Sequence, residues 1–350
     1  MSRWADDPDR AADALIERCL DELALKGRLL LVNQGGALAR LLEQRGLDCT
    51  VWNRRLVDGL TGGLTGGHAA APWPPAGPFD SALVRLPKAR DEQRMSVHAS
   101  LSVLAPTITS AGRLVVYGGN DEGIRSAARM LQEVCGGVTV LASRGHGRVL
   151  AAVRPARTHM LQGSLAAWRT AMPLAIAGVV RTWVTYPGLF AAGRLDEGTA
   201  LLTAALPPLL PGARVLDYGC GAGAIGAAAL AAEPRITLDM LDSDTVALEA
   251  VRENVPAARR ILGTRVADAG TGVRYQAIVS NPPLHAGLVE DHALLERLIA
   301  DAPAALVAGG VLQLVVQRRV PLDRQLARHF ARAEVVAENG RYRVWRAATA

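Results

Sequence analysis

The chain has 350 residues, of which 50% are hydrophobic and 21% charged, with a formal net charge of +6. This length and composition favour about two packed domains and argue against a disordered chain. No apolar run is long enough to predict a membrane span, and the positive charge favours an anionic partner, with nucleic acid first.

The cysteines and the N-terminus bear on compartment and metal binding. Cys19, Cys49, Cys135 and Cys220 are scattered, and no pair has metal-ligand or redox spacing. The segment 1–7 is too polar and acidic for a secretory signal. We therefore expect reduced thiols, a cytoplasmic location, no metal and no membrane association.

The first half of the chain alternates apolar runs typical of strands with helical patterns, which predicts a parallel sheet. A Gly/Pro-rich loop over 59–78 interrupts this order. The expected strands are 28–32, 49–52, 79–86 and 113–117, the expected helices are 37–45, 90–106 and 124–134, and a closing hairpin is expected at 138–143 and 148–153.

The second half repeats this order, which predicts an internal duplication of one α/β unit. The expected domains are 1–155 and 185–350, with a linker region at 156–184. The expected strands are 214–217, 236–241, 264–267, 276–280 and 311–316, the expected helices are 224–232, 245–254 and 291–300, and a terminal pair is expected at 335–336 and 342–345.

The two copies differ where chemistry is expected. The first copy has Val32-Asn33-Gln34-Gly35-Gly36 where the second has the run from Asp217 to Gly223, and Leu86-Pro87-Lys88 where the second has Asn281-Pro282-Pro283. Because the first copy lacks both the glycine spacing and the amide, we expect it to keep the fold without a cofactor site.

A glycine-rich turn joins a strand to a helix in the second copy. Gly219, Gly221 and Gly223 alternate there, and glycine lets the backbone approach a ligand closely beside a helix N-terminus. The pattern fits a dinucleotide site, a methyl-donor site or a tight turn. About twenty residues on, Asp242 ends the next strand, where a carboxylate accepts hydrogen bonds from both ribose hydroxyls.

Charge distinguishes the possible cofactors. Asp217 precedes the first glycine by two residues, and its carboxylate suits the cationic methionine end of S-adenosylmethionine, whereas it repels a pyrophosphate. Asp244 is the better helix cap by position, which leaves Asp242 for a ligand. Asp268 follows the third expected strand and is predicted to face the adenine amine, or else to be solvated.

The segment Asn281-Pro282-Pro283-Leu284-His285 follows a short apolar strand. Two prolines give a stiff, non-helical backbone that presents one amide side chain at the strand end. The Asn281 side-chain oxygen and the Pro282 carbonyl are predicted to accept both N–H bonds of an exocyclic amine and to aim its lone pair at a methyl donor. His285 is near enough in sequence to assist, and a structural role for it stays open.

These motifs together resemble class I methyltransferases of the small-subunit ribosomal RNA guanine-N2 type. The resemblance rests on the glycine loop, Asp242, the Asn-Pro-Pro turn and an upstream run at 186–190 continuing through Asp196-x-Gly198. It implies an α/β fold of two tandem Rossmann-like class I methyltransferase domains, the N-terminal one degenerate and serving folding and RNA binding. It also implies S-adenosylmethionine as cofactor, with Asp196 and Asn281 among its contacts, and ribosomal RNA or the small ribosomal subunit as partner.

One residue departs from that family, which usually has an aromatic residue after Asn-Pro-Pro where this chain has Leu284. Leucine does not stack on a base as an aromatic ring does. Methylation of adenine N6 or of a protein glutamine therefore stays an alternative, as does a non-catalytic RNA-binding assembly factor that retains the donor site. Arginines at 259–260, 318–319 and 341–346 are candidate phosphate contacts, or solvated faces.

Overall fold

The fold is seen in a computed structural model, which describes residues 8–23, 25–34, 36–56, 68–106, 112–144, 147–156, 158–189, 194–282, 285–286, 289–290 and 292–350. Two compact units divide the chain, Met1–Trp168 and Arg169–Ala350. The region expected as a linker carries an antiparallel hairpin of β8 (Thr170–Ile176) and β9 (Val179–Thr185), which belongs to the second unit.

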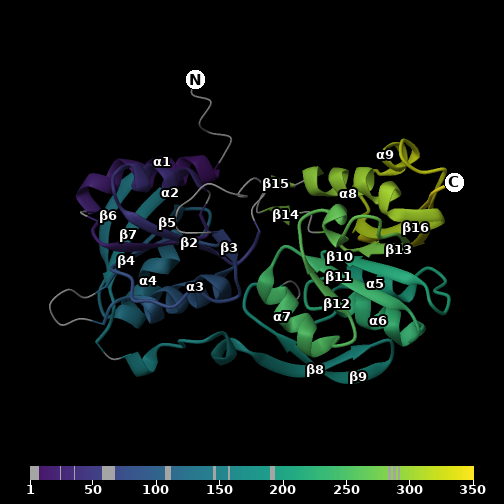
Figure 1. Ribbon diagram of the computed structural model, residues 1–350, viewed down its shortest axis with the longest axis horizontal. Helices are drawn as coiled ribbons and strands as arrows, with labels where there is room; N and C mark the ends of the chain where they lie inside the picture. Colours follow the sequence, from purple (N-terminus) through teal and green to yellow (C-terminus); the bar gives the residue numbers. More distant parts are fainter. Residues whose placement is uncertain are drawn as a thin grey trace. The chain divides into compact units, whose positions relative to one another are not determined.

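The first unit is built around a seven-stranded sheet with the order β3-β2-β1-β4-β5-β7-β6 (Figure 1). Its strands run parallel except for β7, which pairs antiparallel with both of its neighbours. Its elements in chain order are α1 (Pro8–Leu23), β1 (Arg28–Val32), α2 (Gly36–Gln44), β2 (Asp48–Asn53), β3 (His68–Ala70), β4 (Ser81–Arg85), α3 (Arg90–Val103), β5 (Arg113–Gly119), α4 (Ile124–Cys135), β6 (Thr139–Arg144), β7 (Gly147–Val153), and the 3₁₀ turns η1 (Thr158–Met160) and η2 (Leu165–Trp168).

The second unit repeats this topology, with the order β12-β11-β10-β13-β16-β18-β17. Every strand of one sheet therefore has a counterpart in the other, which confirms the predicted duplication. After β8 and β9 its elements are α5 (Glu197–Ala204), β10 (Arg214–Tyr218), α6 (Ala224–Ala232), β11 (Thr237–Asp242), α7 (Thr245–Asn254), β12 (Arg259–Leu262), η3 (Val266–Ala269), β13 (Tyr275–Ser280), β14 (His285–Ala286), β15 (Val289–Glu290), α8 (His292–Ala305), β16 (Leu306–Gln317), α9 (Asp323–Ala327), β17 (Arg332–Glu338) and β18 (Tyr342–Ala348).

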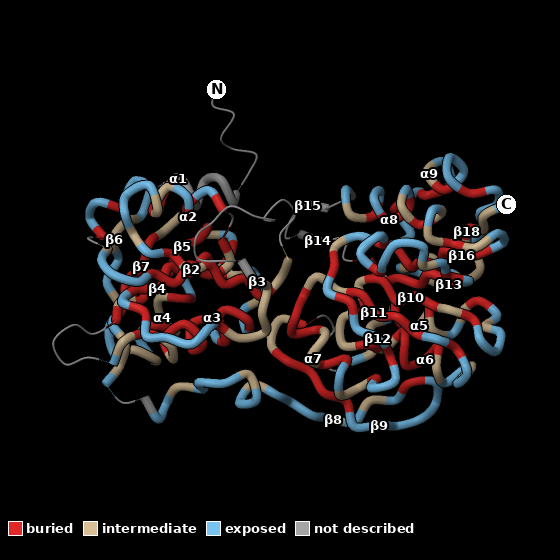
Figure 2. The backbone as a smooth tube through the Cα atoms, in the orientation of Figure 1, coloured by how far each residue is buried: buried red, intermediate tan, exposed pale blue. Residues whose placement is uncertain are grey.

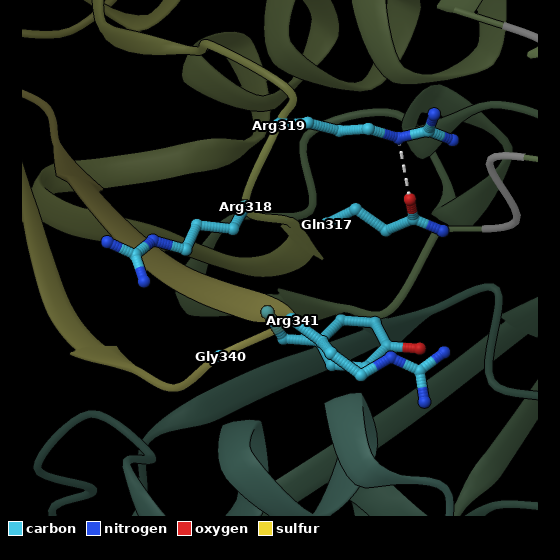
Figure 3. A pocket seen from close by; sticks show the side chains of 6 residues that line it. Gln317, Arg318, Arg319, Gly340 and Arg341 are labelled. Atoms are coloured by element: carbon cyan, nitrogen blue, oxygen red, sulfur yellow. Dashed lines mark hydrogen bonds between the residues drawn. The ribbon is translucent and has the colours of Figure 1, made fainter.

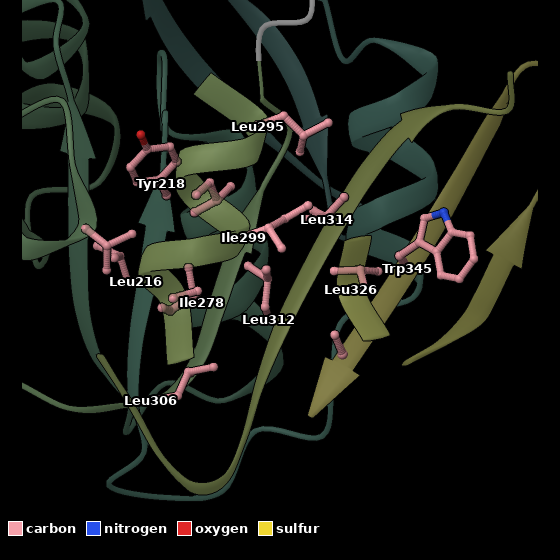
Figure 4. Packing of buried hydrophobic residues seen from close by; sticks show 14 of the residues in the cluster. Leu216, Tyr218, Ile278, Leu295, Ile299, Leu306, Leu312, Leu314, Leu326 and Trp345 are labelled. Carbon is pink, nitrogen blue, oxygen red and sulfur yellow. The ribbon is translucent and has the colours of Figure 1, made fainter. Parts of the chain in front are cut away.

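Each sheet is buried on both faces, as parallel sheets are when helices cover them. In β1 the four residues after Arg28 have no exposed surface, and red segments run through the middle of both units in Figure 2. In the second unit, α8 and α9 pack on one face of the sheet, where Leu295 and Ile299 meet Leu216, Ile278 and strand β16 (Figure 4). These cores hold the strand ends in place, and the strand ends carry the polar residues of interest.

Several elements differ from the sequence-based expectation. The helices α1, α5 and α9 and the hairpin β8–β9 were not predicted, and β3 lies within the loop expected over 59–78. The third strand of the second unit is Arg259–Leu262 instead of 264–267. Its first residue, Arg259, makes a bidentate ion pair with the fully buried Asp239 on β11 at 2.7 and 2.8 Å. A tertiary ion pair thus places an arginine in a strand, so the phosphate contact expected of Arg259 is replaced by a structural one.

Sheet register corrects how the two copies correspond. Val84 pairs with Val32 in the first unit, and Ser280 pairs with Tyr218 in the second. The residue after each pair is Arg85 in one copy and Asn281 in the other, so Arg85, and not Leu86, occupies the position of the amide. By the same register Leu31, Asn33 and Asn53 stand at the positions of Asp217, Gly219 and Asp242.

The carboxyl edge of the first sheet is filled by its own side chains. Asn53 accepts from the Gln34 amide at 2.9 Å and donates to the Gln34 carbonyl at 3.0 Å. Arg85 forms a buried two-point ion pair with Glu122 at 2.6 and 2.7 Å, and this pairing holds the pKa of Glu122 below its usual range against the effect of burial. With Leu31 in place of a carboxylate, this edge has lost the groups that suit a methyl donor.

Candidate active site

The candidate site lies at the carboxyl edge of the second sheet, where β10 lies between β11 and β13. In open α/β sheets ligands bind at such an edge, at the point where the strand order reverses. All three motifs found in the sequence lead to this edge: the glycine loop follows β10, Asp242 ends β11, and Asn281 follows β13.

The glycine loop needs its glycines for backbone conformation and for space. Gly219, Gly221 and Gly223 have φ of +69°, +52° and +99°, a region that other residues rarely adopt. A Cβ on Gly219 or Gly221 would meet no atom within 4 Å, so the loop borders open space. A Cβ on Gly223 would lie 3.0 Å from Val255 Cγ2, so here glycine also allows the helix to pack on the sheet.

Asp242 organises this loop. One carboxylate oxygen accepts from the Gly221 amide at 2.8 Å and the other from the Asp244 amide at 2.9 Å. Asp244 caps α7 by accepting from the Val246 amide at 2.9 Å, as predicted from its position. A carboxylate has about four acceptor positions, so Asp242 retains capacity for ribose hydroxyls while it fixes the loop.

Asp217 is fully buried below the loop. Its Oδ2 accepts from the Gly226 amide at 2.9 Å, while its Oδ1 is buried with no hydrogen-bond partner in the described structure. Burial, and next the charge of Asp242, raise the pKa of Asp217 to about 7. A buried carboxylate oxygen without a donor favours a cationic ligand group, so the residues fit the ammonium end of S-adenosylmethionine.

Asp268 lies beside Asp242 through the next loop. Gly263 donates from its amide to the Asp242 carbonyl at 3.0 Å, and a Cβ on Gly263 would lie 2.6 Å from that of Asp268. Asp268 itself accepts from the amides of Thr264 and Arg265 at 2.8 and 2.9 Å. It therefore caps its own turn, and its contact with an adenine amine stays a prediction.

Asn281 has its amide oriented by α5. Its Nδ2 donates to Thr199 Oγ1 at 2.9 Å and lies 3.5 Å from both carboxylate oxygens of Asp196. Since a carboxylate only accepts, the NH₂ group must face Asp196, and Oδ1 faces the opposite way. The side chain thus offers an acceptor at the strand end, which is what gripping an amine requires.

Asp196 is the N-cap of α5 and accepts from the amides of Gly198 and Thr199 at 3.0 and 3.2 Å. Its carboxylate therefore contacts the amide that is predicted to hold the substrate. The expected contact of Asp196 with the cofactor stays a prediction.

The rest of the Asn-Pro-Pro turn is described only in part. Pro282 is buried, Pro283 and Leu284 lie outside the described residues, and His285 is described only as part of β14.

Two supporting residues were missed by sequence reasoning. Asn254 donates from Nδ2 to the carbonyls of Ala222 at 2.9 Å and Val184 at 2.8 Å, which ties the glycine loop to β9. Thr199 orients Asn281 from 82 residues away in sequence. The glycine, proline and aspartate spacings that revealed the other residues are local, and no local signal pointed to these two.

Membrane-spanning helices and metal clusters are both absent from the described residues. No helix there has the length and hydrophobicity needed to cross a membrane. No group of three or more His, Cys, Asp or Glu side chains there is placed to hold a metal ion.

Fold and site together define a class I S-adenosylmethionine-dependent methyltransferase. The family model of the methyltransferase small domain matches residues 181–346, and that of its N-terminal domain matches 14–159. The chain belongs to the family of ribosomal RNA small subunit methyltransferase C. It is 32% identical to that enzyme from Hahella chejuensis over 92% of this chain and 94% of the relative, and 31% identical to the one from Shewanella halifaxensis over 76% of each.

A solved structure shares the fold over nearly the whole chain. The T. thermophilus 16S rRNA N2 methyltransferase (RsmC), in complex with AdoMet and guanosine, matches with a TM-score of 0.81 at 23% identity. The match covers 99% of this chain and 93% of that one. Tandem methyltransferase domains are thus the architecture of this protein.

Proposed function

We propose that this chain transfers a methyl group from S-adenosylmethionine to the exocyclic N2 amine of a guanosine in small-subunit ribosomal RNA, in the cytoplasm. The observation that carries the proposal is the orientation of Asn281, with its NH₂ group held by Thr199 and Asp196 and its oxygen directed away from them. The curated relatives are named as ribosomal RNA methyltransferases, which supports RNA over a protein glutamine. The T. thermophilus relative is named as an N2 methyltransferase in complex with guanosine, which supports guanosine over adenine.

The donor site is formed by three carboxylates around the glycine loop. When bound, S-adenosylmethionine supplies an electrophilic methyl group. Asp217 holds the ammonium group through its unpartnered oxygen, Asp242 accepts from the ribose hydroxyls, and Asp268 faces the adenine amine. Asp196 contributes indirectly, since it positions Asn281 beside the donor site.

The substrate amine is held by the strand end that follows β13. Asn281 Oδ1 and the Pro282 carbonyl accept its two N–H bonds, which draws the nitrogen lone pair out of conjugation with the ring and aims it at the donor. A guanine inside a stacked helix cannot reach this edge, so the target base must leave its stack. By sequence, Pro283 adds stiffness to the turn, Leu284 stands where the family usually has an aromatic residue, and His285 is a candidate for receiving the proton released after transfer.

The product of the reaction tests this function. We expect protein incubated with labelled methyl donor and small ribosomal subunits to place the label in N2-methylguanosine after digestion to nucleosides. Label in N6-methyladenosine or in protein would indicate the other amine substrates. Donor binding by calorimetry without any transfer would indicate a non-catalytic assembly factor.

Donor affinity should depend on pH through Asp217. Its raised pKa of about 7 means that it is protonated below that pH in the free protein, while a cationic ligand group prefers its ionised form. The donor association constant should therefore rise about tenfold from pH 6 to pH 8. Below the pKa, binding must first remove the proton from Asp217, which lowers the affinity. Above the pKa the carboxyl is already ionised, so the constant levels off. Calorimetry at several pH values measures this.

The Asp217→Asn variant is the control for titration of the donor itself. It should bind more weakly at pH 8 and should lose the part of the pH dependence that belongs to the protein. An identical pH dependence in both proteins would show that Asp217 does not meet the ammonium group.

A further inference from the structure

An arginine-lined pocket opens beside the candidate active site. It has a volume of about 460 Å³ and lies where β16 ends and where the turn between β17 and β18 returns (Figure 3). Its lining residues are Gln317, Arg318, Arg319, Gly340, Arg341 and Tyr342.

The backbone of this pocket is held by hydrogen bonds. Asn339 Oδ1 accepts from the amides of Arg341 and Tyr342 at 2.9 and 2.8 Å and so closes the turn. The Arg318 amide donates to the Arg341 carbonyl at 2.8 Å, which ties the end of β16 to that turn. The arginine side chains therefore project from a frame that does not need a ligand to form.

Two arginines of the pocket have long, exposed ion pairs. Arg341 lies 3.4 Å from Glu197 and Arg318 lies 3.8 Å from Glu338, and these two arginine side chains are 73% and 51% exposed. Ion pairs this long and this exposed contribute little, so an anion can bind to Arg341 without breaking a strong pair. Gln317, Arg319 and Arg341 extend to one side of the strand end and Arg318 to the other, and Arg319 Nε donates to Gln317 Oε1 at 2.8 Å.

The pocket lies close to Asn281. Ser280 pairs with Leu314 in the parallel register of β13 and β16. Gln317 therefore lies one strand across and two residues further along than Asn281, which places their Cα atoms about 8 Å apart. The first turn of α5 contacts both the pocket and Asn281. Tyr342 lies 3.1 Å from where a Cβ on Gly198 would be, and the next residue, Thr199, holds the Asn281 amide.

We propose that Arg319 and Arg341, with Gln317, bind the phosphodiester backbone of the RNA strand next to the target guanosine. The inference rests on the proposed function and extends it, because it assigns a contact for the nucleotides that flank the methylated base. Arginine presents a planar fork that matches phosphate oxygens, and Gln317 offers an amide donor to the same anion. A phosphate held this near the strand end fixes where the displaced base can reach.

The test compares two double variants of the full chain. Arg319→Ala/Arg341→Ala removes the subsite, and Arg274→Ala/Arg332→Ala removes the same charge from exposed arginines at the opposite edge of the same sheet. Binding of a single-stranded RNA with one guanosine among uridines is measured by fluorescence anisotropy over a range of salt concentrations. Donor binding is measured by calorimetry.

The subsite variant should bind the RNA about tenfold more weakly, and its salt slope should fall by about 0.7, since one neutralised phosphate of a single strand contributes about that much. The control should change less than twofold, and both variants should bind the donor as the parent does. Equal losses in both variants, or no loss in either, would overturn the subsite. If the methylation product proves not to be N2-methylguanosine, the proposed function fails, while the difference in RNA binding still decides the pocket.

Discussion

Replacing Asn281 by alanine should reduce the rate of methyl transfer by at least about a thousandfold and leave donor affinity within a few-fold. The side-chain oxygen is one of the two acceptors that we propose hold the amine, and losing both a positioned acceptor and the aim of the lone pair costs several kcal/mol of barrier. The Asn281 side chain makes hydrogen bonds to Asp196 and Thr199 and none to the donor loop among the described residues, so that loop keeps its own hydrogen bonds. Single-turnover transfer and calorimetry with the donor measure the two effects.

Variants of Thr199 test whether the orientation of the Asn281 side chain matters, and not only its presence. Thr199→Val keeps the shape but removes the acceptor at 2.9 Å, so the Asn281 amide is free to rotate and transfer should slow by about tenfold. Thr199→Ser keeps the hydroxyl and should restore most of the rate. If Asn281→Ala turns over normally, or if valine and serine at 199 behave alike, Asn281 does not hold the substrate as proposed.

The fold followed from the sequence wherever local signals and tertiary packing agree. Apolar runs bounded by glycine and proline marked most strands, and the repeated order of elements revealed the duplication. The third strand of the second unit was missed because it begins with two arginines, and only the buried Asp239 on the neighbouring strand explains Arg259 there. The hairpin β8–β9 was missed because its strands are largely exposed and contain Pro173, so they lack the alternation of a half-buried strand.

The site followed from the sequence only where spacing carries the chemistry. The alternating glycines and the aspartate at the next strand end could be found from the sequence, because backbone φ values and strand ends depend mainly on local residues. The orientation of Asn281 is different, since it depends on the first turn of α5, which the fold brings from more than 80 residues away. The proximity of Asp196 to Asn281 likewise depends on the fold, and nothing in the sequence alone indicates it.

Replacing Asp242 by alanine should weaken donor binding by about a hundredfold or more. Its carboxylate accepts from the Gly221 and Asp244 amides and retains capacity for two ribose hydroxyls. Hydrogen bonds to a charged group contribute about 1.5–3 kcal/mol each, and losing those to the ribose accounts for that factor. The glycine loop also loses the acceptor that holds Gly221 at its positive φ. The donor must then order this loop when it binds, and that entropy cost weakens its affinity further.

Asp244→Asn is the matched control, because it lies two residues away and asparagine caps a helix as well as aspartate does. It should bind the donor within about twofold of the parent, with an unchanged melting temperature. Calorimetry gives the affinities, and thermal unfolding without donor separates a lost ligand contact from a lost fold. If the Asp242→Ala protein stays folded and binds the donor as tightly as the parent, the ribose does not bind at this strand end. The glycine loop would then be a tight turn, and the donor would have to bind without the strand-end carboxylate that the sheet places beside it.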